Sequence, residues 1–360
     1  CIRDSIRAMI ETPQSVWFES GTPQDVQQAV KNTVQRAAGK KTVPVLVAYN
    51  LPFRDCAQFS AGGATTVEEY TAWIDGFAAG VGDAQALVIL EPDGLGIIPW
   101  YKQFRGTPSE AGDYEWCQPA EADEATAADE RFAMLNYAVD TLKAQPNVSV
   151  YLDSTHSSWL GSGDAAHRLI QAGVERADGF FLNVSNYRFT EHLEKYGQWT
   201  SDCIYLSQNS WWQVQLCASQ YYPADPNDFS TWYMTDAAYD QAFADTGLTR
   251  DPALQAQFVI DTSRNRLGSW APPAYPDPQD WCNPPDRGLG LRPTADTGNP
   301  LLDATLWVKI PGESDGECTR GLGSAGETVD PEWGIIDPPA GEWFPEMVLD
   351  LVDNANPELP

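Results

Sequence analysis

Short apolar runs rich in β-branched and aromatic residues recur along the chain, and turn residues bound each of them. This pattern is typical of buried strands. It predicts seven strands, at residues 15–19, 42–50, 86–93, 148–155, 179–186, 257–262 and 304–310. Segments with helical spacing of apolar residues separate most of the strands, and polar cap residues precede several of these segments. The predicted helices are residues 23–38, 66–81, 125–144 and 164–172.

Alternating strands and helices indicate an α/β protein. Several predicted strands are almost continuously apolar, as in a parallel sheet that is covered on both faces. No glycine-rich nucleotide-binding loop follows any of them, so the usual reason for an open sheet is missing. We therefore expect a distorted seven-stranded parallel β/α barrel, similar to a TIM barrel, in one catalytic domain that covers residues 1–360.

Two segments, residues 201–249 and 269–300, do not show this periodicity and are rich in Pro, Asp, Trp and Tyr. They are predicted to be long irregular loops, which usually serve function. No apolar stretch is long enough to span a membrane, and the N-terminus has no signal-peptide pattern. We expect a soluble protein without membrane contacts, and a chain that lacks a short N-terminal segment.

The charge balance limits the classes of partner. The chain has 51 acidic and 22 basic residues, which gives a formal net charge of −29. A surface with this much negative charge repels phosphate backbones and anionic lipids. Nucleic acid is therefore excluded as a partner. Its 14 Trp and 14 Tyr are flat amphipathic rings that suit stacking on sugars, although a core and an ordinary surface would account for about half of them.

Seven cysteines are scattered without a C-x-x-C spacing, and the chain has only three histidines. This pattern argues against a zinc site and favours disulfides, and therefore an oxidising compartment and secretion. The odd count leaves one thiol over, for which Cys1 is the candidate. We expect no metal and no cofactor. The histidines are interpreted as structural, with His156 able to join a network around Asp153.

Acidic residues recur where the predicted strands end. In a β/α barrel these ends meet on one face, where the active site lies. Carboxylates that crowd one mouth raise one another's pKa values, so the arrangement favours catalysis over stability. Inverting glycosidases need two carboxyl groups roughly 6.5–9.5 Å apart. The strand-end set consists of Glu19, Asp55, Glu91, Asp93, Asp153, Asp261, Glu313 and Asp315.

Four motifs carry a resemblance to a known family. They are YNLPFRDC at residues 49–56, LEPDGL at 90–95, YLDSTHSSWLG at 151–161 and WVKIPGESDG at 307–316. In sequence and in order they resemble family six of the glycoside hydrolases, which contains cellobiohydrolases and endoglucanases. The similarity runs from about Val16 to the segment 354–357. The family's fold agrees with the barrel expected from the alternation of strands and helices.

The resemblance implies catalytic roles. Asp93 matches the family's general acid, Asp55 a second aspartate that raises the pKa of this acid and helps to handle the attacking water, and Asp315 the proposed base. The family leaves open whether the base reaches the water directly or through a relay. Asp153 matches a supporting carboxylate, with a structural pairing to Arg54 as the alternative. Tyr49 matches a ring that crowds the sugar at the cleaved bond.

The resemblance also implies substrate-binding residues. Stacking positions match Trp17, Trp159 and Trp281, and hydroxyl-binding positions match Lys309 and Glu313. Asn186 and Arg264 match more weakly, and ordinary structural roles remain open for both. Ser60 is expected to hold the catalytic water, although its spacing from Asp55 differs by one residue from the family pattern. Ser162 stands where fungal members often carry a second tryptophan, so one stacking subsite is either weakened or supplied by the 201–249 loop.

Three disulfides follow from the same resemblance. The family's two conserved bridges imply pairs of Cys56 with Cys117 and of Cys282 with Cys318. An additional bridge would join Cys203 to Cys217 and stiffen the insertion around Trp211 and Trp212.

These expectations together describe a secreted, monomeric enzyme that hydrolyses the β-1,4 bonds of cellulose and cellooligosaccharides with inversion. The lengths of segments 201–249 and 317–339 favour a loop-covered tunnel that releases cellobiose from chain ends. An endo-acting cellulase with an open cleft is the alternative. A non-catalytic cellulose-binding protein is the alternative from another class, and it would require the loss of an acid that the sequence retains.

Overall fold

The structure is a computed structural model that describes residues 2–102 and 113–359. Seven parallel strands form one sheet in the order β1 to β7, as the sequence predicts. Every strand ends earlier than predicted, because the polar residues that follow belong to loops. The strands are β1 Val16–Phe18, β2 Val45–Ala48, β3 Ala86–Leu90, β4 Val148–Asp153, β5 Gly179–Leu182, β6 Gln257–Asp261 and β7 Leu302–Leu306.

The sheet is buried on both faces because alternate side chains point to opposite sides of each strand. In β3, Val88 and Leu90 belong to the large core between sheet and helices, whereas Ile89 belongs to a second, smaller cluster. Ile89 lies beside Val47 and Tyr151 in the register of the sheet. The smaller cluster fills the interior of the curled sheet, so the barrel is packed and has no central pore.

The barrel is distorted because no ladder joins β1 to β7 among the described residues. Single hydrogen bonds bridge this gap. The Ser15 amide donates to the carbonyl of Trp307 at 3.0 Å, and the indole of Trp17 donates to the carbonyl of Val308 at 2.9 Å. Strand β1 and the residue before it are therefore hydrogen-bonded to the segment that follows β7.

All four predicted helices are present. Thr22 is the N-cap of helix α2, and its side chain forms a reciprocal capping box with Asp25. Pro23 occupies the first helical turn. These features explain why the start of this helix was clear from the sequence. The helices of the described residues are α1 Ile2–Glu11, α2 Pro23–Lys40, α3 Val67–Val81, α4 Ala127–Lys143, α5 Ser162–Gln171, α6 Thr190–Asn209, α7 Tyr233–Thr246 and α8 Pro345–Asp353.

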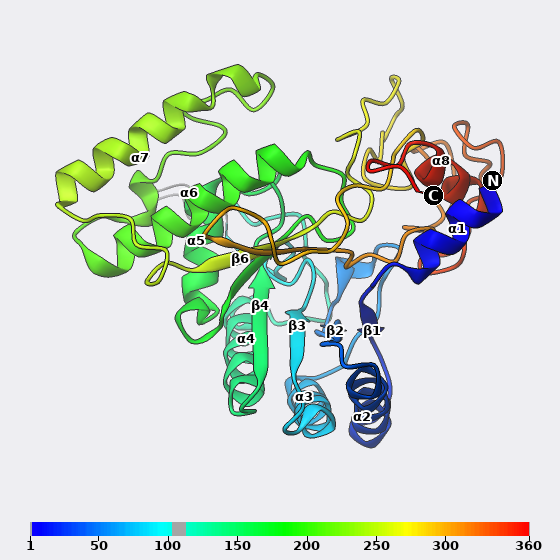
Figure 1. Cartoon of the computed structure of the whole chain (residues 1–360), viewed down its shortest axis with the longest axis horizontal. Helices are drawn as coiled ribbons and strands as arrows, with labels where there is room; N and C mark the ends of the chain where they lie inside the picture. Colours follow the sequence, from blue (N-terminus) through cyan, green and yellow to red (C-terminus); the bar gives the residue numbers. More distant parts are fainter. Residues whose placement is uncertain (1, 103–112, 360) are drawn as a thin grey trace.

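The prediction of an irregular loop at residues 201–249 is wrong for residues 201–209 and 233–246, whereas residues 210–232 contain only short 3-10 turns. Helix α6 continues through Asn209, and α7 occupies residues 233–246 at the end of the molecule opposite both termini (Figure 1). The buried residues of α7 are spaced as one helical face, and they are Thr235, Tyr239, Ala242 and Phe243. Aromatic and acidic residues lie between and around them, and this composition resembles that of a loop.

Helices α1 and α8 were not predicted. They pack together beside the two termini, with Met9 of α1 in one buried cluster with Met347 and Leu351 of α8 (Figure 1). Residues 269–300, all of which the structure describes, form neither helix nor strand, as expected. Within the described ranges, no helix has both the length and the apolar character needed to cross a membrane.

Candidate active site

The candidate site lies where the strands end at their carboxyl edge, and the backbone there is unusual. Asp55, Asp93 and Thr155 have φ angles of 56°, 62° and 53°. Such left-handed conformations are unfavourable for residues with a side chain, and they persist where the surrounding structure enforces them. The loops are therefore held in shapes that aim particular side chains into the site.

Asp93 follows β3 and is surrounded by negative charge. Burial raises the pKa of the Asp93 carboxyl well above its ordinary value, and the nearby carboxylates of Asp153 and Asp55 raise it further. None of the described residues donates a hydrogen bond to this carboxyl that would stabilise its ionised form. Asp93 therefore holds its proton more firmly than an ordinary aspartate does, which is the property that a general acid needs.

Asp153, at the end of β4, organises the Asp93 loop. Its carboxylate accepts backbone amides from Thr155 at 2.8 Å, Leu95 at 3.2 Å and Gly96 at 3.1 Å. Burial raises its pKa to about 6 in spite of these bonds. The alternative of a structural pairing with Arg54 is wrong, because the Arg54 guanidinium donates instead to backbone carbonyls of its own loop and of Glu19, just after β1.

Asp55, Ser60 and Tyr49 form one linked group. The amide and hydroxyl of Ser60 donate to Asp55 Oδ2 at 2.8 and 2.9 Å, and the hydroxyls of Ser60 and Tyr49 lie 3.1 Å apart. Burial raises the pKa of Asp55, while the hydrogen bonds from Ser60 oppose this rise. The Tyr49 ring packs edge-on to Trp17 with centroids 5.5 Å apart. These contacts bring the four residues to one side of the site.

Asp315 has the opposite environment. Its Oδ1 accepts Arg264 Nη2 at 2.8 Å, and its Oδ2 accepts Arg264 Nη1 at 3.1 Å, Tyr187 Oη at 2.8 Å and the Asn283 amide at 3.0 Å. Burial alone would raise the pKa of Asp315, but the positive charges of Arg264 and Lys309 hold it below the ordinary value. This carboxylate stays ionised, as a base or an electrostatic stabiliser must.

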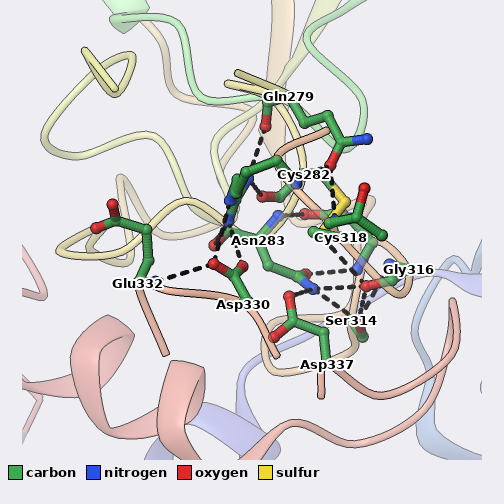
Figure 2. The surroundings of a disulfide bond; sticks show 12 residues. Gln279, Cys282, Asn283, Ser314, Gly316, Cys318, Asp330, Glu332 and Asp337 are labelled. Atoms are coloured by element: carbon green, nitrogen blue, oxygen red, sulfur yellow. Dashed lines mark hydrogen bonds and ion pairs between the residues drawn. A yellow bond between two sulfur atoms is a disulfide. The ribbon is translucent and has the colours of Figure 1, made fainter. Parts of the chain in front are cut away.

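Asn283 clamps the Asp315 loop. The backbone amide of Asn283 donates to the Asp315 carboxylate, and its side-chain Oδ1 accepts the backbone amide of Asp315 at 2.7 Å. Its Nδ2 lies 2.9 Å from an oxygen of Asp337 (Figure 2). The disulfide between Cys282 and Cys318 fixes this clamp from the side. The Asp315 loop therefore depends on buried polar contacts about twenty residues beyond it in the chain.

Cys318, Asp330 and Asp337 lie close enough together to resemble a metal site (Figure 2). However, the Cys318 sulfur is bonded to Cys282, and the Asp330 carboxylate is paired with the fully buried Arg320 at 2.7 Å. A disulfide sulfur is not a thiolate ligand, and a neutralised carboxylate gains little from a cation. The group fits a structural network better than an ion.

Two other strand-end acids serve the loops. Glu91 accepts the amides of Asn50 and Leu51 at 2.9 to 3.1 Å, and burial raises its pKa to about 7. Asp261 accepts the amides of Val308 and Lys309 at 3.2 and 3.0 Å. Each carboxylate ties its own strand end to a neighbouring loop. Within the strand-end set of acids, Glu91 and Asp261 therefore have a structural role.

Several predicted sugar-binding side chains lie around these acids. Trp17 contacts Tyr49, Trp159 packs against the loop that follows Asp93, and Trp281 lies next to the Asn283 clamp with its ring 5.9 Å from that of Phe59. Lys309 is buried, and its ammonium donates to the carbonyl of Ser314 at 3.2 Å. Burial raises the pKa of the Glu313 carboxyl, and the nearby charge of Lys309 opposes this rise.

Direct sugar binding by Arg264 and Asn186 is not supported. The Arg264 side chain has 0% exposure, and its guanidinium is occupied by Asp315 and the carbonyl of Ser185. The Asn186 amide nitrogen donates to the nearby carbonyl of Val184 at 3.2 Å. For both residues the structural role that the sequence left open fits the contacts, and Arg264 acts through Asp315.

All three expected disulfides are present, at Cys56–Cys117, Cys203–Cys217 and Cys282–Cys318. The expectation of a free thiol at Cys1 lies outside the described residues. His156 is buried, with its Nδ1 accepting the amide of Ser158, and burial holds its pKa well below the ordinary value. A neutral, enclosed imidazole agrees with its structural interpretation.

Sequence reasoning missed three positioning residues. Tyr187 and Asn283 bind Asp315, and their places after β5 and beside Cys282 are signals that were available. Arg131 of α4 joins the two acid loops, because its guanidinium donates to the carbonyls of Gly94 and Pro52 at 2.9 and 2.8 Å. A helical arginine far from the motifs gives no such signal.

Comparisons with known sequences agree with this geometry. The profile of the family described as glycosyl hydrolases family 6 matches residues 2–355. The chain is 33% identical over 347 residues to Endoglucanase 1 of Streptomyces halstedii, which covers 96% of this chain and 79% of that protein. It is 31% identical over 345 residues to Endoglucanase A of Cellulomonas fimi, covering 96% of this chain and 55% of that protein. The chain thus spans about half the length of the Cellulomonas relative.

Solved structures show the same fold. The endoglucanase Cel6 of Mycobacterium tuberculosis, in complex with a thio-linked cellobiosyl cellobioside, has a TM-score of 0.67 and 31% identity, and the match covers 97% of this chain and 89% of that chain. Cellobiohydrolase II of Humicola insolens, in complex with glucose and cellotetraose, has a TM-score of 0.64 at 23% identity, with coverage of 99% and 91%. The second likeness supports the fold alone.

Proposed function

The chain belongs to glycosyl hydrolase family 6, and on that premise we propose that it hydrolyses the β-1,4-glucosidic bonds of cellulose with inversion of configuration. One observation carries this proposal: the site holds two carboxyls whose pKa values are shifted in opposite directions. The pKa of Asp93 is raised by burial and like charges, and the pKa of Asp315 is lowered by Arg264 and Lys309. Such a pair is what an inverting glycosidase requires.

In this proposal Asp93 donates its proton to the glucosidic oxygen as the bond to the anomeric carbon breaks. A water adds its oxygen to that carbon from the opposite face and loses a proton to the carboxylate side of the site. Asp315 Oδ1 is the receiving oxygen, directly or through a second water, because it has one hydrogen-bond donor while Oδ2 has three. Asp55 and Ser60 orient the water, and Tyr49 crowds the sugar ring.

The anomer of the first product tests this mechanism. Proton NMR of cellotetraose during the first minutes of hydrolysis should show the α anomer in excess before mutarotation. An initial β anomer would indicate retention and would contradict the proposal. Absence of any released product, with cellooligosaccharide binding intact, would support the alternative of a non-catalytic binding protein.

The mode of attack is a finer proposal. We propose release of cellobiose from chain ends, supported by the segment 317–339. This segment directly follows the Asp315 loop and is tied to the Asn283 clamp by the Cys282–Cys318 disulfide and by Asp337. The other expected roof, residues 201–249, contains the end of α6 and the whole of α7, so it no longer supports a tunnel. The names of the relatives that are more than 30% identical favour the second candidate, an endo-acting enzyme with an open cleft.

Viscosity of carboxymethylcellulose separates the two modes. A chain-end enzyme releases reducing sugar with little loss of viscosity, whereas a rapid fall at low sugar release would establish the endo mode. Secretion is proposed from the three disulfides and the acidic surface. The proposed partners are cellulose and cellooligosaccharides, acted on by a monomer.

A further inference from the structure

Two buried arginines on successive helices bind the loop that follows β3. Arg131 of α4 and Arg168 of α5 are almost fully enclosed, which is rare for charged side chains unless they are paired. The Arg131 guanidinium donates to the carbonyls of Gly94 and Ile97 at 2.9 and 2.7 Å. The Arg168 guanidinium donates to the carbonyl of Leu95 at 2.9 Å. These two residues, the arginine pair, therefore hold the carbonyl side of one short loop.

Asp153 holds the amide side of the same loop. Its Oδ2 accepts the amides of Leu95 and Gly96 at 3.2 and 3.1 Å. Each of the two peptide units between Gly94 and Gly96 therefore donates its N–H to Asp153, while one member of the arginine pair binds its carbonyl. Hydrogen bonds with a charged partner are stronger than neutral ones. Both peptide planes are thus fixed between opposite charges.

The fixed peptide units directly follow Asp93 in the chain. The Asp93 carbonyl accepts the amide of Ile97 at 2.7 Å, and the φ angle of Asp93 is 62°, a left-handed conformation that a free loop rarely holds. Asp153 is also one of the two carboxylates whose charge raises the pKa of Asp93. The placement of Asp93 relative to Asp153 therefore depends on peptide units that the arginine pair holds.

The positive charges of the arginine pair are compensated by other acids. Arg168 forms ion pairs with Asp164 at 2.8 Å and with Glu115. Burial lowers the pKa of Arg131, and the nearby carboxylate of Glu91 opposes this fall. Neither arginine is among the causes that shift the pKa of the proposed general acid. The pair can therefore orient the loop through its carbonyls without favouring the ionised form of that acid.

We propose that Arg131 and Arg168 are positioning residues for proton donation: through the loop after β3 they hold the Asp93 carboxyl where it can reach the glucosidic oxygen. Neither guanidinium contacts the sugar, because both are enclosed and bound to protein oxygens. This inference rests on the proposed function. Loss of either arginine should impair the transfer of the proton and leave the other parts of the site in place.

The dependence of the rate on the leaving group tests this role. Cellotetraose needs a proton on its leaving oxygen, whereas dinitrophenolate leaves a dinitrophenyl β-cellotrioside without one. Arg168→Lys keeps the charge but lacks the planar fork that binds the carbonyl and two carboxylates together. We expect its kcat on cellotetraose to fall by roughly tenfold to a hundredfold, because an acid misplaced by about an ångström transfers its proton poorly. Its kcat on the dinitrophenyl substrate should stay near that of the parent protein.

Arg131→Lys is the second variant, and it should show the same dependence on the substrate if Arg168→Lys does not fold. Rates are measured at a temperature at which circular dichroism shows each variant to be folded. An equal loss on both substrates would indicate a general disturbance of the site and would overturn the positioning role. Unchanged kcat on cellotetraose in the folded variants would overturn it as well.

Arg250→Lys is a matched control. Arg250 also pairs with a buried carboxylate, Asp202, at 2.8 Å, and its guanidinium lies 4.6 Å from the centroid of the Phe243 ring, as that of Arg168 lies 4.4 Å from the centroid of Tyr101. It precedes β6, whereas the acid loop follows the carboxyl end of β3. The ratio of the two rates should therefore be that of the parent protein.

The variant Asp93→Asn separates this inference from its premise. It should lose cellotetraose hydrolysis and retain cleavage of the dinitrophenyl substrate. If Asp93→Asn affects both substrates equally, or neither, the proposed acid role fails and the role of the arginine pair fails with it. If Asp93→Asn discriminates between the substrates but neither arginine variant does, only the inference about the arginine pair fails.

Discussion

The loops after β2, β3 and β4 differ from those after β6 and β7 in the charges that they place next to a buried aspartate. On the first side, Asp93 is buried near Asp153 and Asp55, without a cation among the causes that shift its pKa. On the second side, Asp315 is buried as deeply but is paired with Arg264. The pKa of the same residue type is therefore raised on one side and lowered on the other. Burial alone does not assign a role, because the sign of the neighbouring charges decides it.

Removing the proton donor should have the largest effect. Asp93→Asn keeps the size of the side chain but cannot deliver a proton, so turnover on cellulose should fall by roughly two to four orders of magnitude, while binding survives. Substrates with very good leaving groups need little protonation and should be cleaved at near-parent rates. Full activity of Asp93→Asn on cellulose, measured as released reducing sugar, would remove Asp93 from the acid role.

Removing the cation on the other side should destabilise the fold. Arg264→Met leaves the buried Asp315 carboxylate without its ion-pair partner, and we expect a loss of about 3–5 kcal/mol in the free energy of unfolding in urea. The double variant Arg264→Met with Asp315→Asn removes the orphaned charge and should recover part of this loss. Equal destabilisation of the single and double variants would show that Asp315 is not the group that Arg264 compensates.

The acid side can be probed through the pH dependence of kcat/KM. The ionised Asp153 raises the pKa of Asp93, so Asp153→Asn should lower that pKa and move the alkaline limb of the profile to lower pH. Asp178→Asn is the control, because this carboxyl binds Lys143 at the opposite end of the sheet and should leave the limb in place. A uniform loss of activity without a shift would mean that Asp153 acts only as a loop anchor.

The narrowest effect, limited to the pH dependence of stability, is expected at Asp337, behind the Asp315 loop. Burial raises its pKa to about 7, so the folded state holds a proton that the unfolded chain has lost. Its stabilising contribution is therefore complete below the ordinary pKa and disappears as the pH rises to about 7. Asp337→Asn cannot titrate, so the stability difference between parent and variant should shift in favour of the variant from pH 4 towards pH 7. Parallel urea-unfolding curves across this range would contradict the assignment.

The strands were predictable from the sequence because a sheet buried on both faces leaves runs such as residues 86–90, which local composition reveals. Helix α7 was not predicted, although its buried residues repeat at helical intervals and alanine is its commonest residue. Its aromatic and acidic residues continue the loop-like composition of the segment around it. The helices α1 and α8 depend on packing against each other, and this contact spans nearly the whole chain. The local pattern of apolar residues does not reveal contacts between segments so far apart in the sequence.

Motifs singled out Asp93, Asp55 and Asp315 as candidates, but the contacts of these side chains could not be predicted. Position at a strand end alone did not distinguish them from Glu91 and Asp261, which bind backbone amides. That distinction depends on which loop comes to lie beside each strand end, and so on the closed fold. The role of Arg264 as partner of Asp315 depends on the fold in the same way.

Carboxyl carbon NMR of the ¹³C-labelled aspartates tests the central claim most directly, because it follows each protonation in the resting protein. Spectra of Asp93→Asn and Asp315→Asn would assign the two resonances by their loss. The account predicts that the Asp93 carboxyl titrates well above the ordinary aspartate range, and that the Asp315 carboxyl remains ionised below that range. An Asp93 carboxyl that is already ionised at the pH where the enzyme works would contradict it.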